Sequence, residues 1–267
     1  MPSRTNTARP ALTSGDWIRG YRPRPDAALR LVCFPHAGGS ATAYHPWASA
    51  FGPDIDVLAV QYPGRQDRHA EPLVHDLQEL ADLALPAVRD AVEGRPFALF
   101  GHSMGAALAF EVTRRLEARG DGPSLLAVSG RRAPSLPATS GGPVHHLDDD
   151  AVVAHLQDLS GTDPRLLEDP DVREMILPVV RADLRAVETH RSVPGTTVDA
   201  PVLSLTGADD PWTSVAEARG WSAHTTGDFS LRVFPGGHFY LAEHQAEVVA
   251  HLSEELGSRL SARSARL

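Results

Sequence analysis

The fold is decided by residues 96–119, which read PFALFGHSMGAALAFEVTRRLEAR. A short apolar run, residues 96–100, leads into a Gly-x-Ser-x-Gly turn centred on Ser103, and an amphipathic run follows and stops at Gly120. A strand, this turn and a helix in that order project a serine hydroxyl above a parallel sheet. The glycines allow a tight turn, and the N-terminus of the helix favours negative charge nearby. We therefore predict that Ser103 is a nucleophile.

Apolar runs of similar kind occur on both sides of this stretch. They occupy residues 29–34, 55–61, 125–129, 202–206 and 231–234. Runs that are rich in Val, Leu and Phe and do not alternate are typical of strands buried on both faces of a parallel sheet. Helical patterns lie between them, including residues 76–93 with a kink expected at Pro86, and a capping box at Ser214 and Glu217. The alternation predicts an α/β fold, a mostly parallel central sheet with helices on both faces.

One region interrupts the alternation. Residues 131–194 contain no convincing strand, but two amphipathic segments, residues 151–159 and 172–187, flank the sequence Gly161-Thr162-Asp163-Pro164. We predict a single domain over residues 1–267, with a core of residues 1–130 and 195–267 and a helical lid at about residues 131–194.

A serine nucleophile needs a general base, and the base needs an orienting acid. In folds with this turn the acid and then the histidine follow in loops after later strands. The run 202–206 leads into Gly-Ala-Asp209-Asp210-Pro, and the run 231–234 leads into Pro-Gly-Gly-His238-Phe. His238 is therefore the predicted base. Asp209 and Asp210 both remain candidates for the acid, because Asp210 followed by Pro211 is also typical of a helix cap.

An oxyanion hole requires two backbone donors. One is expected from Met104, the residue after the nucleophile, and the other from the loop after an early strand. Residues 35–39, Pro-His-Ala-Gly-Gly, form such a loop, so we predict Ala37 as the second donor. We assign His36 a loop-shaping role, since His238 fills the position of the base.

The composition excludes several other kinds of protein. The chain of 267 residues has a net charge of −9, which disfavours a general affinity for nucleic acid, and it has no lysine, which excludes Schiff-base chemistry. The single cysteine, Cys33, lies in an apolar run and is expected in the core. No run approaches the roughly 20 apolar residues of a membrane helix. The N-terminus does not resemble a signal peptide, so a cytoplasmic protein is expected.

We expect no cofactor and no metal. The sequence His145-His146-Leu-Asp-Asp-Asp150 could suggest a metal site. A solvated helix start with acidic residues in its first turn is the better interpretation.

Taken together and in order, the motifs resemble those of type II thioesterases that accompany polyketide and nonribosomal peptide synthases. The matching residues are 34–40, 61–65 with Arg68, 101–105, 129–134, Leu177-Pro178 with Arg181 to Asp183, Gly207-x-x-Asp210-Pro211 and 236–239. The resemblance implies an α/β-hydrolase with a triad of Ser103, Asp210 and His238, and it thereby selects Asp210 over Asp209. The sequence Ser160-Gly-Thr-Asp-Pro164 departs from the family's usual Gly-Gly-Thr-Pro, which bears on acyl-chain preference.

The resemblance also implies a function in antibiotic biosynthesis. Such a thioesterase hydrolyses aberrant or stalled acyl groups from the phosphopantetheine arm of an acyl or peptidyl carrier protein. A carboxylesterase or a product-releasing thioesterase/cyclase shares the same catalytic residues, although the free-standing length favours the editing role. A scaffold without activity is a further alternative. Candidate residues for docking an acidic carrier are Arg65, Arg68, Arg131 and Arg132, unless these are ordinary solvated arginines. Neither the oligomeric state nor the acyl chain is encoded in a recognisable motif.

Overall fold

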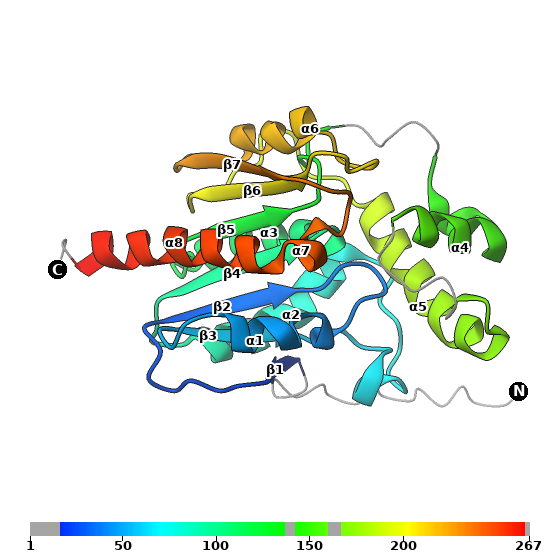
Figure 1. The fold of residues 1–267 in the computed structure, drawn as a ribbon, viewed down its shortest axis with the longest axis horizontal. Helices are drawn as coiled ribbons and strands as arrows, with labels where there is room; N and C mark the ends of the chain where they lie inside the picture. Colours follow the sequence, from blue (N-terminus) through cyan, green and yellow to red (C-terminus); the bar gives the residue numbers. More distant parts are fainter. Residues whose placement is uncertain (1–16, 137–141, 160–166, 265–267) are drawn as a thin grey trace, which may run out of the picture.

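The computed structural model describes residues 17–136, 142–159 and 167–264 (Figure 1). Within this part of the chain, seven strands form one sheet in the order β1-β3-β2-β4-β5-β6-β7. The strands are β1 (Ile18–Gly20), β2 (Leu29–Phe34), β3 (Ile55–Val60), β4 (Phe97–His102), β5 (Leu126–Ser129), β6 (Val202–Gly207) and β7 (Phe229–Phe234). All neighbours are parallel except β1 and β3, which confirms the predicted mostly parallel sheet.

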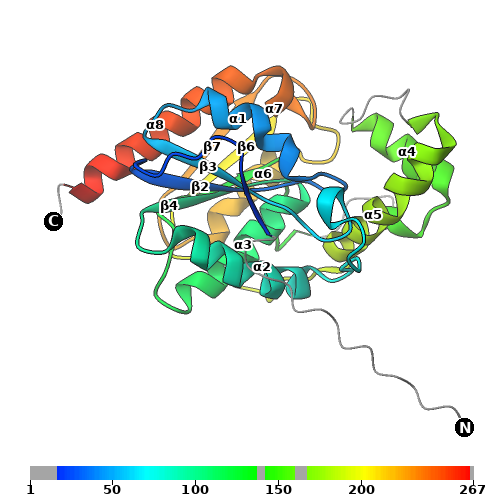
Figure 2. The ribbon, with the colours of Figure 1, turned by 90° about the horizontal axis from the view of Figure 1, so that it is seen from below.

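Helices cover both faces of the sheet, as predicted. The α-helices are α1 (His45–Ala50), α2 (Leu77–Val92), α3 (Met104–Glu117), α4 (Asp149–Asp158), α5 (Pro170–Thr189), α6 (Val215–Arg219), α7 (Tyr240–Glu243) and α8 (Gln245–Ser264). Short 3-10 helices are η2 (Ala41–Tyr44), η3 (Gln66–Arg68), η4 (Val144–His146) and η6 (Gly220–His224). Figure 2 shows α1, α7 and α8 on one face, and α2, α3 and α6 on the other.

Two apolar clusters, one on each face of the sheet, explain why the central strands have no polar face. Cluster residues from β2, β3 and β4 alternate between the α2–α3 side and the α1–α8 side of the sheet. Every residue of β4 is buried. A strand covered on both faces has to be apolar at successive positions, which is the pattern seen in the sequence.

The register of the strands brings the functional loops together. Phe34 of β2 pairs with Gly101 of β4, so the loop of residues 35–39 and the turn at Ser103 leave the sheet side by side. Gly207 of β6 pairs with Phe234 of β7, so the next two loops also emerge as neighbours. All these loops lie at the carboxyl ends of parallel strands, where α/β folds bind their ligands.

The described parts of residues 131–194 contain no strand, as the sequence indicated. We refer to residues 142–159 and 167–194 as the α4–α5 segment. It has a small apolar cluster of its own, built mainly from α4 and α5. Figure 1 shows the segment beyond the carboxyl ends of the parallel strands, over the edge that carries the loops. The departure at residues 160–164 lies outside the described residues.

One local feature adds to the expectations. The antiparallel strand β1 was not predicted, because three residues have no recognisable apolar pattern and owe their conformation to pairing with β3. Pro86 lies within α2 and does not end it. The capping box of Ser214 and Glu217 is present at the start of α6, as predicted.

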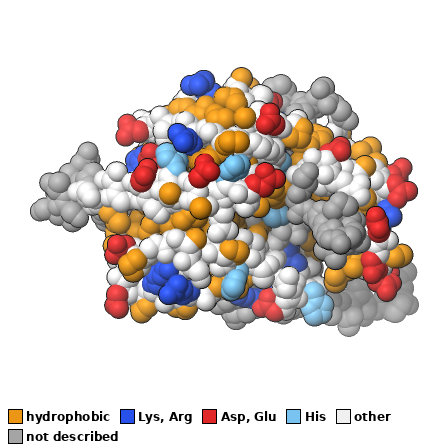
Figure 3. All heavy atoms as spheres, in the orientation of Figure 1, with side chains coloured by type: hydrophobic (Ala, Val, Ile, Leu, Met, Phe, Trp, Pro, Cys, Tyr) orange, Lys and Arg blue, Asp and Glu red, His pale blue; other side chains and the backbone are white. Residues whose placement is uncertain are grey.

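Acidic and basic side chains are interspersed over the face that carries α1 and α8. Where this face is not drawn in grey, Figure 3 shows them scattered among apolar areas. No helix among the described residues is long and apolar enough to cross a membrane.

Candidate active site

Ser103 lies in a strained turn between β4 and α3. Its φ and ψ angles are 55° and −116°, a conformation rarely adopted by residues other than glycine. An added Cβ at Gly101 would collide with the backbone of Gly105, and one at Gly105 would collide with the carbonyl group of Phe34. The Ser103 amide donates to Ser129 O at 2.8 Å. The two glycines are therefore needed for α3 to start directly against the sheet.

We expect Gly105→Ala to lower the free energy of unfolding by about 3 kcal/mol or more, since backbone would have to move away from backbone. Urea unfolding measures the loss. Gly257→Ala is the matched control. An added Cβ there meets nothing within 4 Å, and the helical site should gain about 0.5–1 kcal/mol. Equal midpoints for Gly105→Ala and the wild type would contradict the tight turn.

Asp210 and His238 form a buried pair at the ends of the loops after β6 and β7. His238 Nδ1 lies 2.8 Å from Asp210 Oδ2, and the two residues are 4% and 8% exposed. The other oxygen of Asp210 accepts from the amides of Trp212 at 2.9 Å and Thr213 at 3.2 Å. Asp210 therefore both holds the turn, as a capping residue would, and contacts the histidine. Asp209 is exposed.

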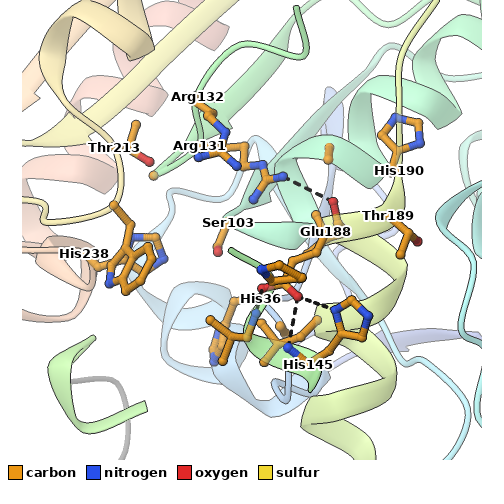
Figure 4. A pocket seen from close by; sticks show the side chains of 18 of the residues that line it. His36, Ser103, Arg131, Arg132, His145, Glu188, Thr189, His190, Thr213 and His238 are labelled. Atoms are coloured by element: carbon orange, nitrogen blue, oxygen red, sulfur yellow. Dashed lines mark hydrogen bonds and ion pairs between the residues drawn. The ribbon is translucent and has the colours of Figure 1, made fainter. Parts of the chain in front are cut away.

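Ser103 and His238 line one cavity of about 720 Å³. Figure 4 shows Ser103, His36 and His238 around this space. Among the described residues, no hydrogen bond joins the Ser103 hydroxyl to His238. Such bonds are often long in unliganded active sites and shorten when the substrate is bound. With Nδ1 engaged by Asp210, Nε2 is the nitrogen of His238 that is available to a nucleophile.

One predicted oxyanion donor lies in the cavity wall, and the other follows Ser103 in the chain. Ala37 lines the cavity beside Ser103, and Met104 is the first residue of α3. Within the described structure, the backbone N–H groups of Ala37 and Met104 donate to no protein acceptor. Free amides at a helix N-terminus and in an adjacent loop can stabilise an oxyanion.

Two further histidines lie beside His238. The ring centroid of His102 is 4.9 Å from that of His238 and 6.1 Å from that of His36. Burial and the neighbouring His238 lower the pKa of His102 well below its usual value and lower that of His36 to about 4. His102 Nδ1 contacts the hydroxyl of Ser129 at 2.9 Å, which contacts that of Tyr240 at 2.7 Å. Both histidines are therefore neutral near pH 7, in keeping with the loop-shaping role predicted for His36.

A histidine that the fold keeps neutral makes stability depend on pH. Between pH 6.5 and about 4 the unfolded chain binds a proton that folded His36 does not bind, so the free energy of unfolding falls as the pH falls through this window. We expect His36→Gln to reduce the loss between pH 7 and pH 5 by about 2 kcal/mol. Urea unfolding at pH 7 and pH 5 measures it, with the exposed His69→Gln as control. An unchanged pH dependence in His36→Gln would contradict the prediction.

The cavity has both apolar and charged walls. Apolar lining comes from α3 and the α4–α5 segment, including Phe110, Leu156, Ile176, Val180 and Leu184. Arg131 also lines the cavity. Its pKa is lowered to about 10, mainly by burial and to a lesser extent by the positive charge of nearby Arg132. Arg131 therefore keeps its positive charge near pH 7. The cavity combines room for an apolar chain with a cation in its wall.

The structure corrects the interpretation of two arginines. Arg65 and Arg68, considered for carrier docking or as solvated residues, are only 8% and 3% exposed. Arg65 pairs with Asp183, and Arg68 pairs with Glu71. Neither is therefore available on the surface. Arg131 and Arg132 line the cavity.

The residues that suggested other chemistry have structural partners. His145 Nδ1 lies 2.5 Å from Glu188 Oε2, and Asp148 caps α4 with Asp149 and Asp150 in its first turn. The described residues contain no group of three or more His, Cys, Asp or Glu placed to hold a metal ion. Cys33 is fully buried in β2, and burial raises the pKa of its thiol. The predicted helix start and the predicted core cysteine are confirmed.

Comparison with known proteins agrees with this geometry. The family model described as "Thioesterase domain" matches residues 29–256. Thioesterase PikA5 of Streptomyces venezuelae is 44% identical over 252 residues, which cover 94% of this chain and 89% of PikA5.

Solved structures agree as well. The type II thioesterase BorB from the borrelidin biosynthetic cluster has a TM-score of 0.83 and 50% identity, covering 92% of this chain and 100% of BorB. YbtT, a type II thioesterase from the yersiniabactin pathway, has a TM-score of 0.83 and 29% identity, covering 91% and 99%. The chain therefore belongs to the thioesterase family, as a serine-type thioester hydrolase with the α/β-hydrolase fold and a type II member of the kind found in polyketide and nonribosomal peptide pathways.

Proposed function

We propose that this thioesterase removes aberrant or stalled acyl groups from the phosphopantetheine arm of acyl or peptidyl carrier proteins. Ser103 is the nucleophile, His238 the general base and Asp210 the orienting acid, and the amides of Ala37 and Met104 form the oxyanion hole. The observation that carries this proposal is the buried 2.8 Å contact between Asp210 and His238 at a cavity that Ser103 also lines.

The reaction proceeds in two steps through an acyl-serine. Nε2 of His238 takes the proton of Ser103 as the hydroxyl oxygen attacks the thioester carbonyl, and the negative oxygen is stabilised by the two amides. Collapse breaks the C–S bond, and the imidazolium returns its proton to the departing sulfur. A thiol of pKa about 8.5 leaves more readily than an alcohol. Water, deprotonated by His238, then attacks the acyl-serine and releases a carboxylic acid and Ser103.

The proposed arrangement of a lid over a core, with a cavity that the α4–α5 segment helps to line, is compatible with an acyl chain carried on a phosphopantetheine arm. We propose that residues 131–194 form a lid on a single domain whose core comprises residues 1–130 and 195–267. The α4–α5 segment supplies much of the apolar wall of the cavity of about 720 Å³, which is large enough for an extended acyl chain. Arg131 and Arg132 remain candidates to meet the acidic carrier or the phosphate of its arm. The proposed site of action is the cytoplasm, where carrier-bound intermediates would be available.

Substrate comparison tests this proposal against the other hydrolases. We expect a higher kcat/KM for an acyl-carrier protein than for the same acyl group on coenzyme A, and the lowest for its oxygen ester. Preference for the oxygen ester would identify a carboxylesterase, and a cyclised product would identify a releasing cyclase. Covalent labelling by a fluorophosphonate, mapped to Ser103, separates all of these from an inactive scaffold.

A further inference from the structure

A buried ion pair lies directly behind the predicted oxyanion loop. Asp183, on α5, is 1% exposed. Its Oδ2 accepts from Nη1 of Arg65 at 2.6 Å, and its Oδ1 accepts from Nη2 of Arg65 at 2.9 Å. Such a two-point contact fixes the orientation of both groups.

The pair is bonded to the backbone of the loop at two points. The Gly38 amide donates to Asp183 Oδ2 at 2.8 Å, and Nη1 of Arg65 donates to Gly39 O at 3.1 Å. Gly38 has a φ of 75°, and an added Cβ would lie 2.7 Å from Cγ2 of Val180. Val180 and Asp183 are three residues apart and share one face of α5. The loop is therefore held directly against this helix.

These bonds determine where the Ala37 amide points. The carbonyl of His36 accepts from Gly39 N at 2.9 Å, and in a planar trans peptide the Ala37 N–H points the opposite way. The turn that contains this peptide is fixed at its far end by Asp183 and Arg65. On the other side, the Tyr62 hydroxyl donates to Pro35 O at 3.0 Å. Tyr62, Arg65 and Asp183 are not among the described residues that line the cavity.

The need for stability alone does not account for such a pair. Two charges taken out of water cost much of what their attraction returns, and well-packed apolar residues of similar volume often replace a buried pair without loss. The loop is hydrogen-bonded to both partners of the pair, which fixes its position. Apolar side chains could not make these bonds. The pair joins two elements, the loop and α5, that are 145 residues apart in sequence.

We propose that Arg65 and Asp183 are positioning residues that hold the Ala37 amide in the oxyanion hole, and that this hole is complete only while α5 is docked. The inference rests on the proposed function through the role of Ala37. Because α5 also forms the cavity wall, a movement of α5 that widens the cavity withdraws the acceptor of Gly38. Substrate admission and oxyanion stabilisation are thereby coupled through a single carboxylate.

The test separates positioning from stability. Asp183→Asn keeps the size of the side chain but leaves the Arg65 charge unpaired, and the double variant Arg65→Met with Asp183→Leu replaces the pair by apolar volume. We expect kcat to fall about 100- to 1000-fold in both, the range for the loss of one oxyanion donor, with KM within about twofold of the wild type. Binding of a trifluoromethyl ketone analogue, which forms a tetrahedral adduct, should weaken by the same factor as kcat.

Stability is measured in the same variants by urea unfolding. The double variant is expected to unfold at a higher urea concentration than Asp183→Asn while remaining equally slow. A matched control is Glu71→Gln, which removes the partner of buried Arg68 away from the oxyanion loop and should leave kcat unchanged. Wild-type activity in the double variant would show that the pair is only structural, and would overturn the inference. Loss of activity in Ser103→Ala with normal kcat in Asp183→Asn would reject the positioning role alone and leave the proposed function intact.

Discussion

Ser103→Ala is expected to lower turnover of an acyl-carrier substrate by at least about a thousandfold, because the acyl group then has no side chain to accept it. The hydroxyl forms no hydrogen bond among the described residues, so the free energy of unfolding should change by no more than about 0.5 kcal/mol. Steady-state release of free thiol measures the first quantity and urea unfolding the second.

The same variant should no longer be labelled by a fluorophosphonate. His102→Gln is a poor control, since His102 contacts His238 within the site. The exposed His69→Gln serves better, and it should keep both activity and labelling. A Ser103→Ala enzyme as active as the wild type would remove Ser103 from the mechanism.

Asp210→Asn is expected to lower kcat by about 10³- to 10⁴-fold with little change in fold. The amide can still accept from the Trp212 and Thr213 amides, so the turn is retained. Toward His238, however, the amide presents N–H. Nδ1 must then accept, the ring proton moves to Nε2, and Nε2 can no longer take the proton of Ser103.

Asp209→Asn is the matched control for this change. It makes the same substitution one residue earlier, at an exposed position, and should leave kcat near the wild-type value. The reverse result, with Asp209→Asn inactive and Asp210→Asn active, would assign the acid to the other aspartate. The pair of variants therefore tests a choice that local sequence pattern left open.

The sheet could be predicted because its strands are buried on both faces. Residues 29–34 coincide with β2, and the other apolar runs match their strands to within two residues at either end. The strand β1 could not be found in this way. Its three residues carry no periodicity, and only pairing with β3 makes them a strand. Tertiary contact, and not local preference, determines that element.

Part of the site could also be predicted from the sequence. The loops after β4, β6 and β7 carry Ser103, Asp210 and His238, and the order of these loops follows from the topology of a parallel sheet. The contact of Arg65 with Asp183 could not be predicted from the sequence, although both residues lie in motifs that carried the family resemblance. They are 118 residues apart, and no spacing rule connects them. Their burial also shows why a charged residue in a loop is not always a surface residue.

Cys33 offers a practical route to the motion of α5. The only thiol of the chain is fully buried, and burial suppresses its ionisation, so maleimide reagents should not reach it in the folded protein. An engineered cysteine at the exposed Met175 of α5 and a second one on the core would thus be the only reactive pair. Spin labels or fluorophores placed there would report the distance between helix and core during turnover, without any need to remove a native cysteine first.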